Sequence, residues 1–208
     1  MKEFILGQSA KPFSARRSRI GGFSMLELVV SMALVLILAG ISLPSFTRSY
    51  RIYELNGSAT RLAGIFKLTR FEAIRRNTTV TCQIQQAGAN WILWADSNGD
   101  GIVDPTETQF LITGTATLLP AGSVPNPAAI TSALNVAGLN TLSGANNSIT
   151  YDARGAVALG GNPPTTVSVL YLGNTGNPDF GYRAVVLLPS GITQVWTAPG
   201  GGNWRRVS

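Results

Sequence analysis

The chain has 208 residues, of which 45% are hydrophobic and only 12% are charged, and its formal net charge is +6. It contains no histidine and a single cysteine, Cys82, which excludes the most common general base, histidine-containing metal sites and an internal disulfide. This inventory indicates a structural or binding protein rather than an enzyme, and we expect Cys82 to be buried and inert.

Residues 1–22 are polar and basic, and we interpret them as a leader. The only acid in the leader is Glu3, and its basic side chains are Lys2, Lys11, Arg16, Arg17 and Arg19. Most of the net charge therefore lies ahead of the apolar part of the chain, so the high pI is poor support for binding of nucleic acid. By the positive-inside rule this end stays in the cytoplasm and the C-terminal domain is exported.

Residues 23–44 are predicted to form a transmembrane helix. No charged residue occurs from Leu28 to Leu43, and a helix over residues 23–43 would be about 30 Å long, which matches the hydrocarbon core of a bilayer. One acid, Glu27, lies near the start of this segment. A carboxylate at the centre of a bilayer costs about 2.5–3.5 kcal/mol on insertion scales, so such a residue points to a function.

A conventional signal peptide, a lipoprotein signal and a plain anchor are the other interpretations of such a segment. None of them explains Glu27, or the position of the small pair Gly21-Gly22 ahead of the apolar run. A lipoprotein would also need a cysteine after the run, and the chain has none there.

Residues 45–76 continue the helical periodicity as an amphipathic segment. Apolar and small residues recur at steps of three and four, namely Ile52, Leu55, Ala59, Leu62, Phe66, Thr69 and Ala73. We therefore predict one long helix from about Phe23 to Arg76, with Asn77 as its stop.

Residues 77–208 are predicted to form an exported, β-rich head domain. Segments rich in Val, Ile, Thr, Tyr and Trp alternate with turn signals, and we expect strands at residues 79–85, 91–95, 108–113, 148–151, 156–159, 166–172, 183–188 and 192–197. Residues 120–147 show little pattern and are expected to be a long loop. The predicted class is α+β.

A basic leader, Gly22, Phe23, Glu27 and an unbroken apolar helix occur in that order, and this arrangement resembles the class III signal of type IV prepilins and type II secretion pseudopilins. The resemblance implies that a prepilin peptidase cuts between Gly22 and Phe23 and methylates the new Phe23 amine. Glu27 would then pair with the Phe23 amine of a neighbouring subunit, which compensates the burial of both charges and fixes axial register. The competing interpretation is that Glu27 reaches back to the membrane interface.

Four segments, at residues 68–82, 91–112, 149–159 and 183–197, together resemble the GspH/FimT family of minor pilins and pseudopilins. The resemblance implies a pilin fold, in which one long N-terminal helix packs on an antiparallel, sandwich-like head. It also implies a minor subunit of a type II secretion pseudopilus or type IV pilus. Such a subunit crosses the bacterial inner membrane once, with its N-terminus cytoplasmic and its head periplasmic or extracellular. Its partners would be prepilin peptidase, other subunits, an inner-membrane assembly platform and lipid.

The acidic stretch between two expected strands has the spacing of an EF-hand loop. Its oxygen ligands would occupy positions 1, 3, 5, 7, 9 and 12, where the sequence has Asp96, Asn98, Asp100, Ile102 (through its carbonyl), Asp104 and Glu107. A structural calcium ion that stiffens the hairpin is one interpretation. A metal-free hairpin turn is the other, because the flanks are strands rather than helices and Asp-Gly pairs favour turns.

The C-terminal pair Arg205-Arg206 lies close in sequence to Trp196 and Trp204, and arginines interleaved with aromatic residues can bind nucleic acid. Family members with roles in DNA uptake carry a basic turn between their last strands, but the corresponding turn here, residues 191–194, has no arginine. A minor pilin that captures extracellular DNA is therefore the alternative function, against the simpler interpretation of a frayed terminus.

Overall fold

The computed structural model describes residues 22–158 and 166–207, so residues 1–21 of the predicted leader lie outside the described residues. The chain divides into two compact units, one ending at Leu43 and the other beginning at Pro44. Helix α1 (Met25–Arg76) contributes its first part to one unit and its second part to the other. Ten strands follow among the described residues: β1 (Val80–Ala87), β2 (Asn90–Asp96), β3 (Gln109–Ile112), β4 (Thr117–Leu119), β5 (Asn140–Thr141), β6 (Asn146–Tyr151), β7 (Ser168–Gly173), β8 (Tyr182–Leu187), β9 (Thr193–Ala198) and β10 (Arg205–Arg206).

Helix α1 ends where the sequence predicts. Asn77 has a left-handed backbone with φ of 51°, a conformation that its short polar side chain tolerates. The N–H of Asn77 donates to the carbonyl of Ile74 and the N–H of Thr78 to that of Ala73. These two bonds form a Schellman motif, which satisfies carbonyls that the helix itself leaves free.

The strands form two sheets. The first has the order β3-β2-β1-β6, and all of its neighbouring strands are antiparallel. The second has the order β10-β9-β8-β7-β4, also antiparallel, and β5 adds to β7 in parallel. This is the predicted α+β class, with one long N-terminal helix and a head of antiparallel sheets.

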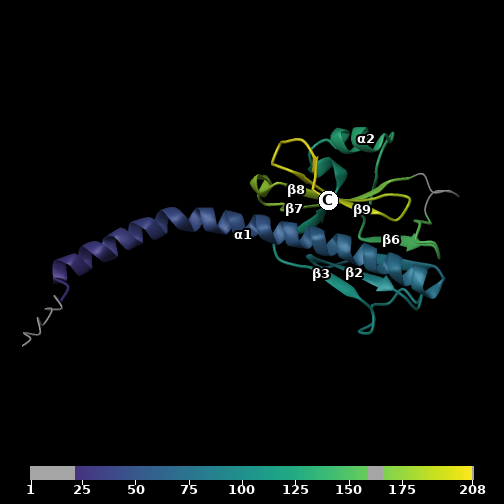
Figure 1. The fold of residues 1–208 in the computed structure, drawn as a ribbon, viewed down its shortest axis with the longest axis horizontal. Coiled ribbons are helices and arrows are strands. Elements are labelled where there is room, and N and C mark those ends of the chain that lie inside the picture. Colours follow the sequence, from purple (N-terminus) through teal and green to yellow (C-terminus); the bar gives the residue numbers. More distant parts are fainter. Residues whose placement is uncertain (1–21, 159–165, 208) are drawn as a thin grey trace, which may run out of the picture. The chain divides into compact units, whose positions relative to one another are not determined.

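The two sheets lie on either side of the second part of α1, within the unit that begins at Pro44 (Figure 1). The predicted apolar face of the helix is buried there, and Leu62 and Phe66 are among its fully enclosed side chains. They share one core with inward-facing residues of both sheets, including Ile84 of β1 and Val185 of β8. Burial against both sheets, rather than helical propensity, stabilises this part of α1.

A second core covers the opposite face of the second sheet. Alternate residues of β7, such as Val169 and Tyr171, point into it, while Leu170 points toward α1. Every residue of β7 is therefore buried. A short helix, α2 (Ala128–Leu134), closes this core with Ile130, and Trp204 packs there from the C-terminal segment.

The structure corrects several expectations. Residues 120–147 are not a plain loop, because they contain α2, β5 and the 3₁₀ turn η1 (Ala121–Ser123). The strand expected at residues 156–159 is reduced to a single bridge between Val157 and Tyr151, and Leu159 lies outside the described residues. A second 3₁₀ turn, η2 (Pro178–Phe180), precedes β8.

Candidate functional site

The predicted cleavage site lies ahead of α1, in chain without regular secondary structure. Gly22 and Phe23 are both exposed, and the Phe23 side chain is 76% exposed. The helix begins at Met25, and Ser24 acts as its N-cap: the Ser24 hydroxyl accepts the backbone N–H of Glu27 at 3.1 Å, and the Ser24 carbonyl accepts the N–H of Leu28. A peptidase could therefore reach the Gly22–Phe23 bond without unwinding the helix.

Glu27 occupies the first turn of α1 and is exposed. An acid at this position is favoured by the positive end of the helix dipole. The sequence Ser24-Met25-Leu26-Glu27 has the spacing of a capping box. This spacing is the signal by which Ser24 can be identified as the N-cap from the sequence.

The first part of α1 exposes apolar side chains all round. Up to Leu43 its large hydrophobic residues, such as Leu36 and Ile41, are exposed. By length and composition, α1 is a helix that could cross a membrane. An exposed surface this apolar needs lipid or other helices to cover it.

The second part of α1 has an outward face that the head leaves uncovered. Exposed Tyr50 and Tyr53 lie beside Leu111 of β3 in one groove, and exposed Leu68 and Phe71 follow further along the helix. These side chains are available to neighbouring molecules, because they are not needed for the core of the head.

The acidic loop joins β2 to β3, and a hydrogen bond from the Ala95 N–H to the Thr108 carbonyl closes its base at 3.0 Å. The Asp96 carboxylate is buried and accepts the N–H groups of Gly99 at 2.7 Å and Gly101 at 3.0 Å. Asn98 and Asp100 accept backbone N–H groups two residues further on.

Asp104 continues the same pattern later in the loop. It accepts the N–H and hydroxyl of Thr106, and these bonds lower the pKa of the Asp104 carboxyl. The Ile102 side chain is exposed, and the backbone N–H of Ile102 donates to the Asp100 carboxylate. Among the residues that the structure describes, no three Asp, Glu, Cys or His side chains converge into a ready-made metal centre.

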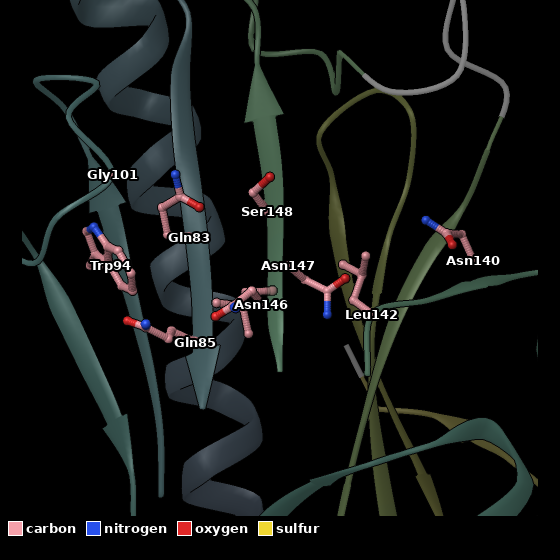
Figure 2. Close-up of a pocket in the computed structure, with 10 residues that line it drawn as sticks. Gln83, Gln85, Trp94, Gly101, Asn140, Leu142, Asn146, Asn147 and Ser148 are labelled. Atoms are coloured by element: carbon pink, nitrogen blue, oxygen red, sulfur yellow. The ribbon is translucent and has the colours of Figure 1, made fainter. Parts of the chain in front are cut away.

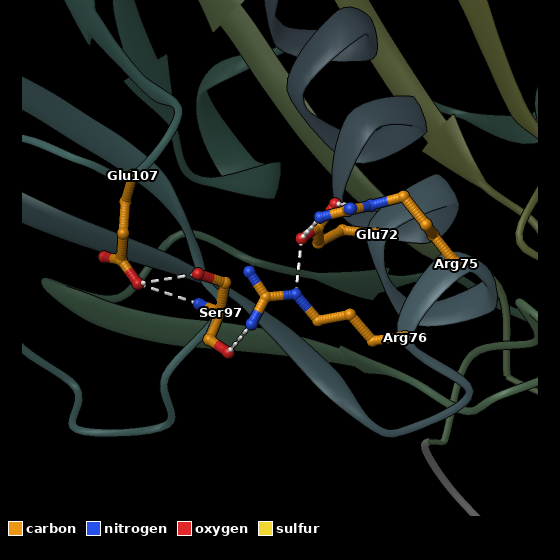
Figure 3. A network of polar contacts seen from close by, with 5 residues as sticks. All are labelled: Glu72, Arg75, Arg76, Ser97 and Glu107. Atoms are coloured by element: carbon orange, nitrogen blue, oxygen red, sulfur yellow. Dashed lines mark hydrogen bonds and ion pairs between the residues drawn. The ribbon is translucent and has the colours of Figure 1, made fainter.

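A charged network connects the end of α1 to this loop (Figure 3). Glu72 accepts hydrogen bonds from Arg75, at 2.6 and 2.9 Å, and from Arg76. Hydrogen bonds from Arg75, then from Arg76, lower the pKa of Glu72 to about 2. Arg76 also donates to the carbonyl of Ser97 at 3.0 Å, so it links the helix to the first turn of the loop.

A polar cavity of about 620 Å³ is lined by residues of β1, β2 and β6 of the first sheet, and by Asn140 and Leu142 from the segment that runs beside β7 of the second sheet (Figure 2). Its walls carry uncharged amides, among them Gln83, Gln85 and Asn147, beside Trp94. These groups can exchange hydrogen bonds with a polar partner. The residues that line this cavity include no acid, lysine, cysteine or histidine, so they supply no catalytic pair.

The structure corrects the expectation that the C-terminal arginines form a frayed terminus. Arg205 and Arg206 are exposed, but they form strand β10 beside β9 and are not a frayed terminus. The two tryptophans near them are buried, with 5% exposure for Trp196 and 3% for Trp204. The Trp204 indole donates to the carbonyl of Pro125 at 3.0 Å. The prediction that these rings could stack on nucleic-acid bases together with the arginines is therefore wrong.

Comparisons with known proteins match both parts of the chain. Residues 58–191 match the family model described as type II transport protein GspH, and residues 17–43 match the prokaryotic N-terminal methylation motif. The second match contains the predicted cleavage site and, together with the apolar helix, indicates that the chain is anchored to a membrane.

Individual proteins match the chain only in part or at low sequence identity. The pilin-like protein PilA1 of Thermus thermophilus is 33% identical over 87 residues, which make up 41% of this chain and 54% of that protein. The chain therefore matches about half the length of this curated relative. Two crystal structures of the type IV minor pilin FimU of Pseudomonas aeruginosa are 15% identical, with TM-scores of 0.44 and 0.45; they cover 74% and 75% of this chain, and the matches cover 98% and 94% of FimU.

The family match spans more than half of the chain and contains α1 from residue 58 onward together with strands of both sheets. This family consists of structural pilin-like subunits. The chain therefore belongs to the GspH family of pseudopilins and minor pilins, and it carries the prokaryotic N-terminal methylation motif.

Proposed function

We propose that the chain is a minor subunit of a type II secretion pseudopilus or a type IV pilus. In this proposal prepilin peptidase removes residues 1–22 on the cytoplasmic side and methylates the Phe23 amine. The anchored subunit is then extracted from the inner membrane into a filament, while its head stays on the periplasmic or extracellular side. An assembly platform in the inner membrane and other pilin-like subunits are its partners.

One observation carries this proposal: a capped helix start holds Glu27 directly after the exposed Gly22–Phe23 bond and directly before an uncovered apolar helix. Cleavage would place a cationic amine at the head of this helix. Glu27 of one subunit could then pair with the Phe23 amine of the next, and a low-dielectric bundle makes such a pair both strong and selective for register.

The first experiment is N-terminal sequencing and intact-mass analysis of the native protein. We expect a chain that begins at Phe23 with a methylated amine. A product that retains Met1, or one trimmed beyond the apolar segment, would contradict the proposal.

The second experiment tests the role of Glu27 in assembly. Glu27→Ala should still insert and be cleaved, but cross-linking should show that it no longer joins filaments. Ser42→Ala is the matched control, because Ser42 is a polar residue of the same segment whose hydroxyl only donates to the Leu38 carbonyl of its own helix. Normal incorporation of Glu27→Ala would contradict the register argument.

Secretion and pilus assembly use the same leader and helix, so the chain's own sequence does not distinguish the two systems. The genes that neighbour its own gene would distinguish them. A neighbouring secretion ATPase with a secretin would support secretion. Neighbouring pilus or competence genes would support a pilus.

Capture of extracellular DNA is the competing function, and the exposed pair Arg205 and Arg206 is its main support. The test is filter binding of duplex DNA to the detergent-purified chain across a salt series, compared with an Arg205→Ala, Arg206→Ala variant. Phosphate contacts make binding strongly dependent on salt. Absence of salt-dependent retention would remove this alternative.

A further inference from the structure

Two carboxylates at the base of the acidic loop are buried, and neither forms an ion pair with a described residue. Asp96 is 4% exposed and Glu107 is 7% exposed. Ion pairs among the described residues involve Glu54 and Glu72, but neither Asp96 nor Glu107. Buried charges in proteins are normally paired with an opposite charge or coordinated to a metal, so a cation bound here would stabilise both carboxylates.

One oxygen of the Glu107 carboxylate accepts no hydrogen bond from the described part of the chain. Its Oε1 accepts the backbone N–H of Ser97 at 2.8 Å and lies 3.4 Å from the Ser97 hydroxyl, so the carboxylate is directed at the start of the loop (Figure 3). Its Oε2 is enclosed and has no hydrogen-bond partner among the residues that the structure describes. Leaving such an acceptor buried and unpaired costs free energy, more so when it is charged.

The rest of the loop is arranged to present oxygens. Asp96 and Glu107 are the first and twelfth residues of the loop, and the bond between Ala95 and Thr108 brings them to the same end of the hairpin. The backbone N–H groups of the loop donate to Asp96, Asn98, Asp100 and Asp104. These bonds fix the side chains on the loop, and each carboxylate still has lone pairs for a cation.

We propose that the loop from Asp96 to Glu107 is a structural binding site for one calcium ion. The carboxylates of Asp96, Asp100, Asp104 and Glu107 would supply the negative charge, with Asn98 and the Ile102 carbonyl as neutral ligands. Calcium fits better than magnesium, because it accepts six to eight oxygens in a flexible geometry, whereas magnesium demands a near-octahedral site. Binding draws the exposed Asp100 and Asp104 toward the buried pair and gives Glu107 Oε2 its missing partner.

Binding is measured on the full chain in detergent after removal of metal with EDTA. Calorimetric titration with calcium chloride should show one site, with a dissociation constant of about 10⁻⁴–10⁻³ M as in extracellular modules. Terbium gives a second readout, because Trp94 and Gly101 of the loop line the same cavity and the indole can sensitise terbium luminescence (Figure 2). Calcium should displace terbium, and magnesium should compete at least ten-fold less well.

Two variants and a control make the test specific. Glu107→Gln keeps an acceptor for Ser97 but removes the charge, so it should weaken calcium binding at least ten-fold. In EDTA the same variant should melt at or above the wild-type midpoint, because it removes an unpaired buried charge. Asp100→Asn, at an exposed position, should also weaken binding. Asp179→Asn, an exposed acid outside the loop, should bind like wild type.

The result that supports the site is a pair of opposite effects of Glu107→Gln. Its melting midpoint in EDTA is equal to or higher than that of the wild type, and its affinity for calcium is lower. An unchanged wild-type midpoint at millimolar calcium overturns it. Equal loss of binding in Asp179→Asn also overturns it, because that result means diffuse attraction to acids. A response to magnesium as strong as that to calcium overturns the choice of ion.

Discussion

The hydroxyl of Ser24 accepts the backbone N–H of Glu27 at 3.1 Å, so the residue that caps α1 also fixes the turn that carries the acid proposed to act in assembly. Cap and acid can be separated by mutation. Ser24→Ala should cost about 0.5–2 kcal/mol of helix stability, since it removes an N-cap. It should speed amide hydrogen exchange at Glu27 in detergent micelles, while cleavage and filament incorporation persist. Ser24→Asp, which also caps helices, should restore slow exchange. Loss of assembly in Ser24→Ala with unchanged exchange would argue against a purely capping role.

The core of the head depends on the inner face of α1. Phe66→Ala should lower the free energy of unfolding by about 3–5 kcal/mol, because it leaves a cavity where the two sheets and the helix meet. Phe71→Ala is the matched control: this ring lies on the same helix but is 61% exposed, so the change should stay within about 0.5 kcal/mol. Denaturant unfolding of both variants measures the difference. Similar losses for the two would mean that the outer face is also covered.

The turn between β8 and β9 requires glycine at position 191. Its φ is 78°, and a Cβ there would collide with the carbonyl oxygen of Gly155, which also accepts a hydrogen bond from Arg70 at 2.9 Å. Gly191→Ala should therefore destabilise the head by about 2–4 kcal/mol, from backbone strain together with the collision.

Gly201→Ala is the control for backbone strain alone. Gly201 has a similar φ of 72° but open space around it, so the loss should be only about 1–2 kcal/mol. Thermal melting compares the two. Equal losses would mean that the contact with Gly155 is relieved at no cost.

The network at the end of α1 gives the head a pH dependence in acid. The pKa of Glu72 is lowered from 4.5 to about 2 by hydrogen bonds from Arg75 and Arg76. Because the folded pKa is the lower one, this stabilisation is fully present above pH 4.5 and is lost as the pH falls toward 2. Glu72→Gln should remove this part of the pH dependence, and melting curves of both proteins between these limits measure it. The effect should be small, because partly exposed ion pairs contribute little. If the melting midpoints of the two proteins fell in parallel over this pH range, the proposed contribution of Glu72 would be contradicted.

Cys82 should be chemically inert in the folded protein. It is fully buried in β1, and burial raises the pKa of its thiol to about 12, so almost no thiolate is present at neutral pH. A thiol reagent such as DTNB at pH 8 should react only after unfolding in guanidinium. Fast reaction of the native protein would show that the β1 region opens readily.

The elements that were predicted correctly have a periodic pattern in the sequence. Leu55, Ala59, Leu62, Phe66, Thr69 and Ala73 repeat with the helical period and are all buried. Helix α2 was missed because it has only seven residues, too few for a period to be recognised, and its place depends on Ile130 packing against the second sheet. Strand β10 was missed for the same reason, since it consists of two residues that pair with β9.

The sequence by itself determined the order of basic segment, acid, apolar helix and amphipathic helix, because charge and hydrophobic period are local properties that every segment displays directly. It also determined the spacing of the acidic loop. Only the tertiary structure decided that Asp96 and Glu107 are both buried, and that Trp196 and Trp204 face a core instead of solvent. Burial depends on which strands pair and what covers them, and no single segment carries that information.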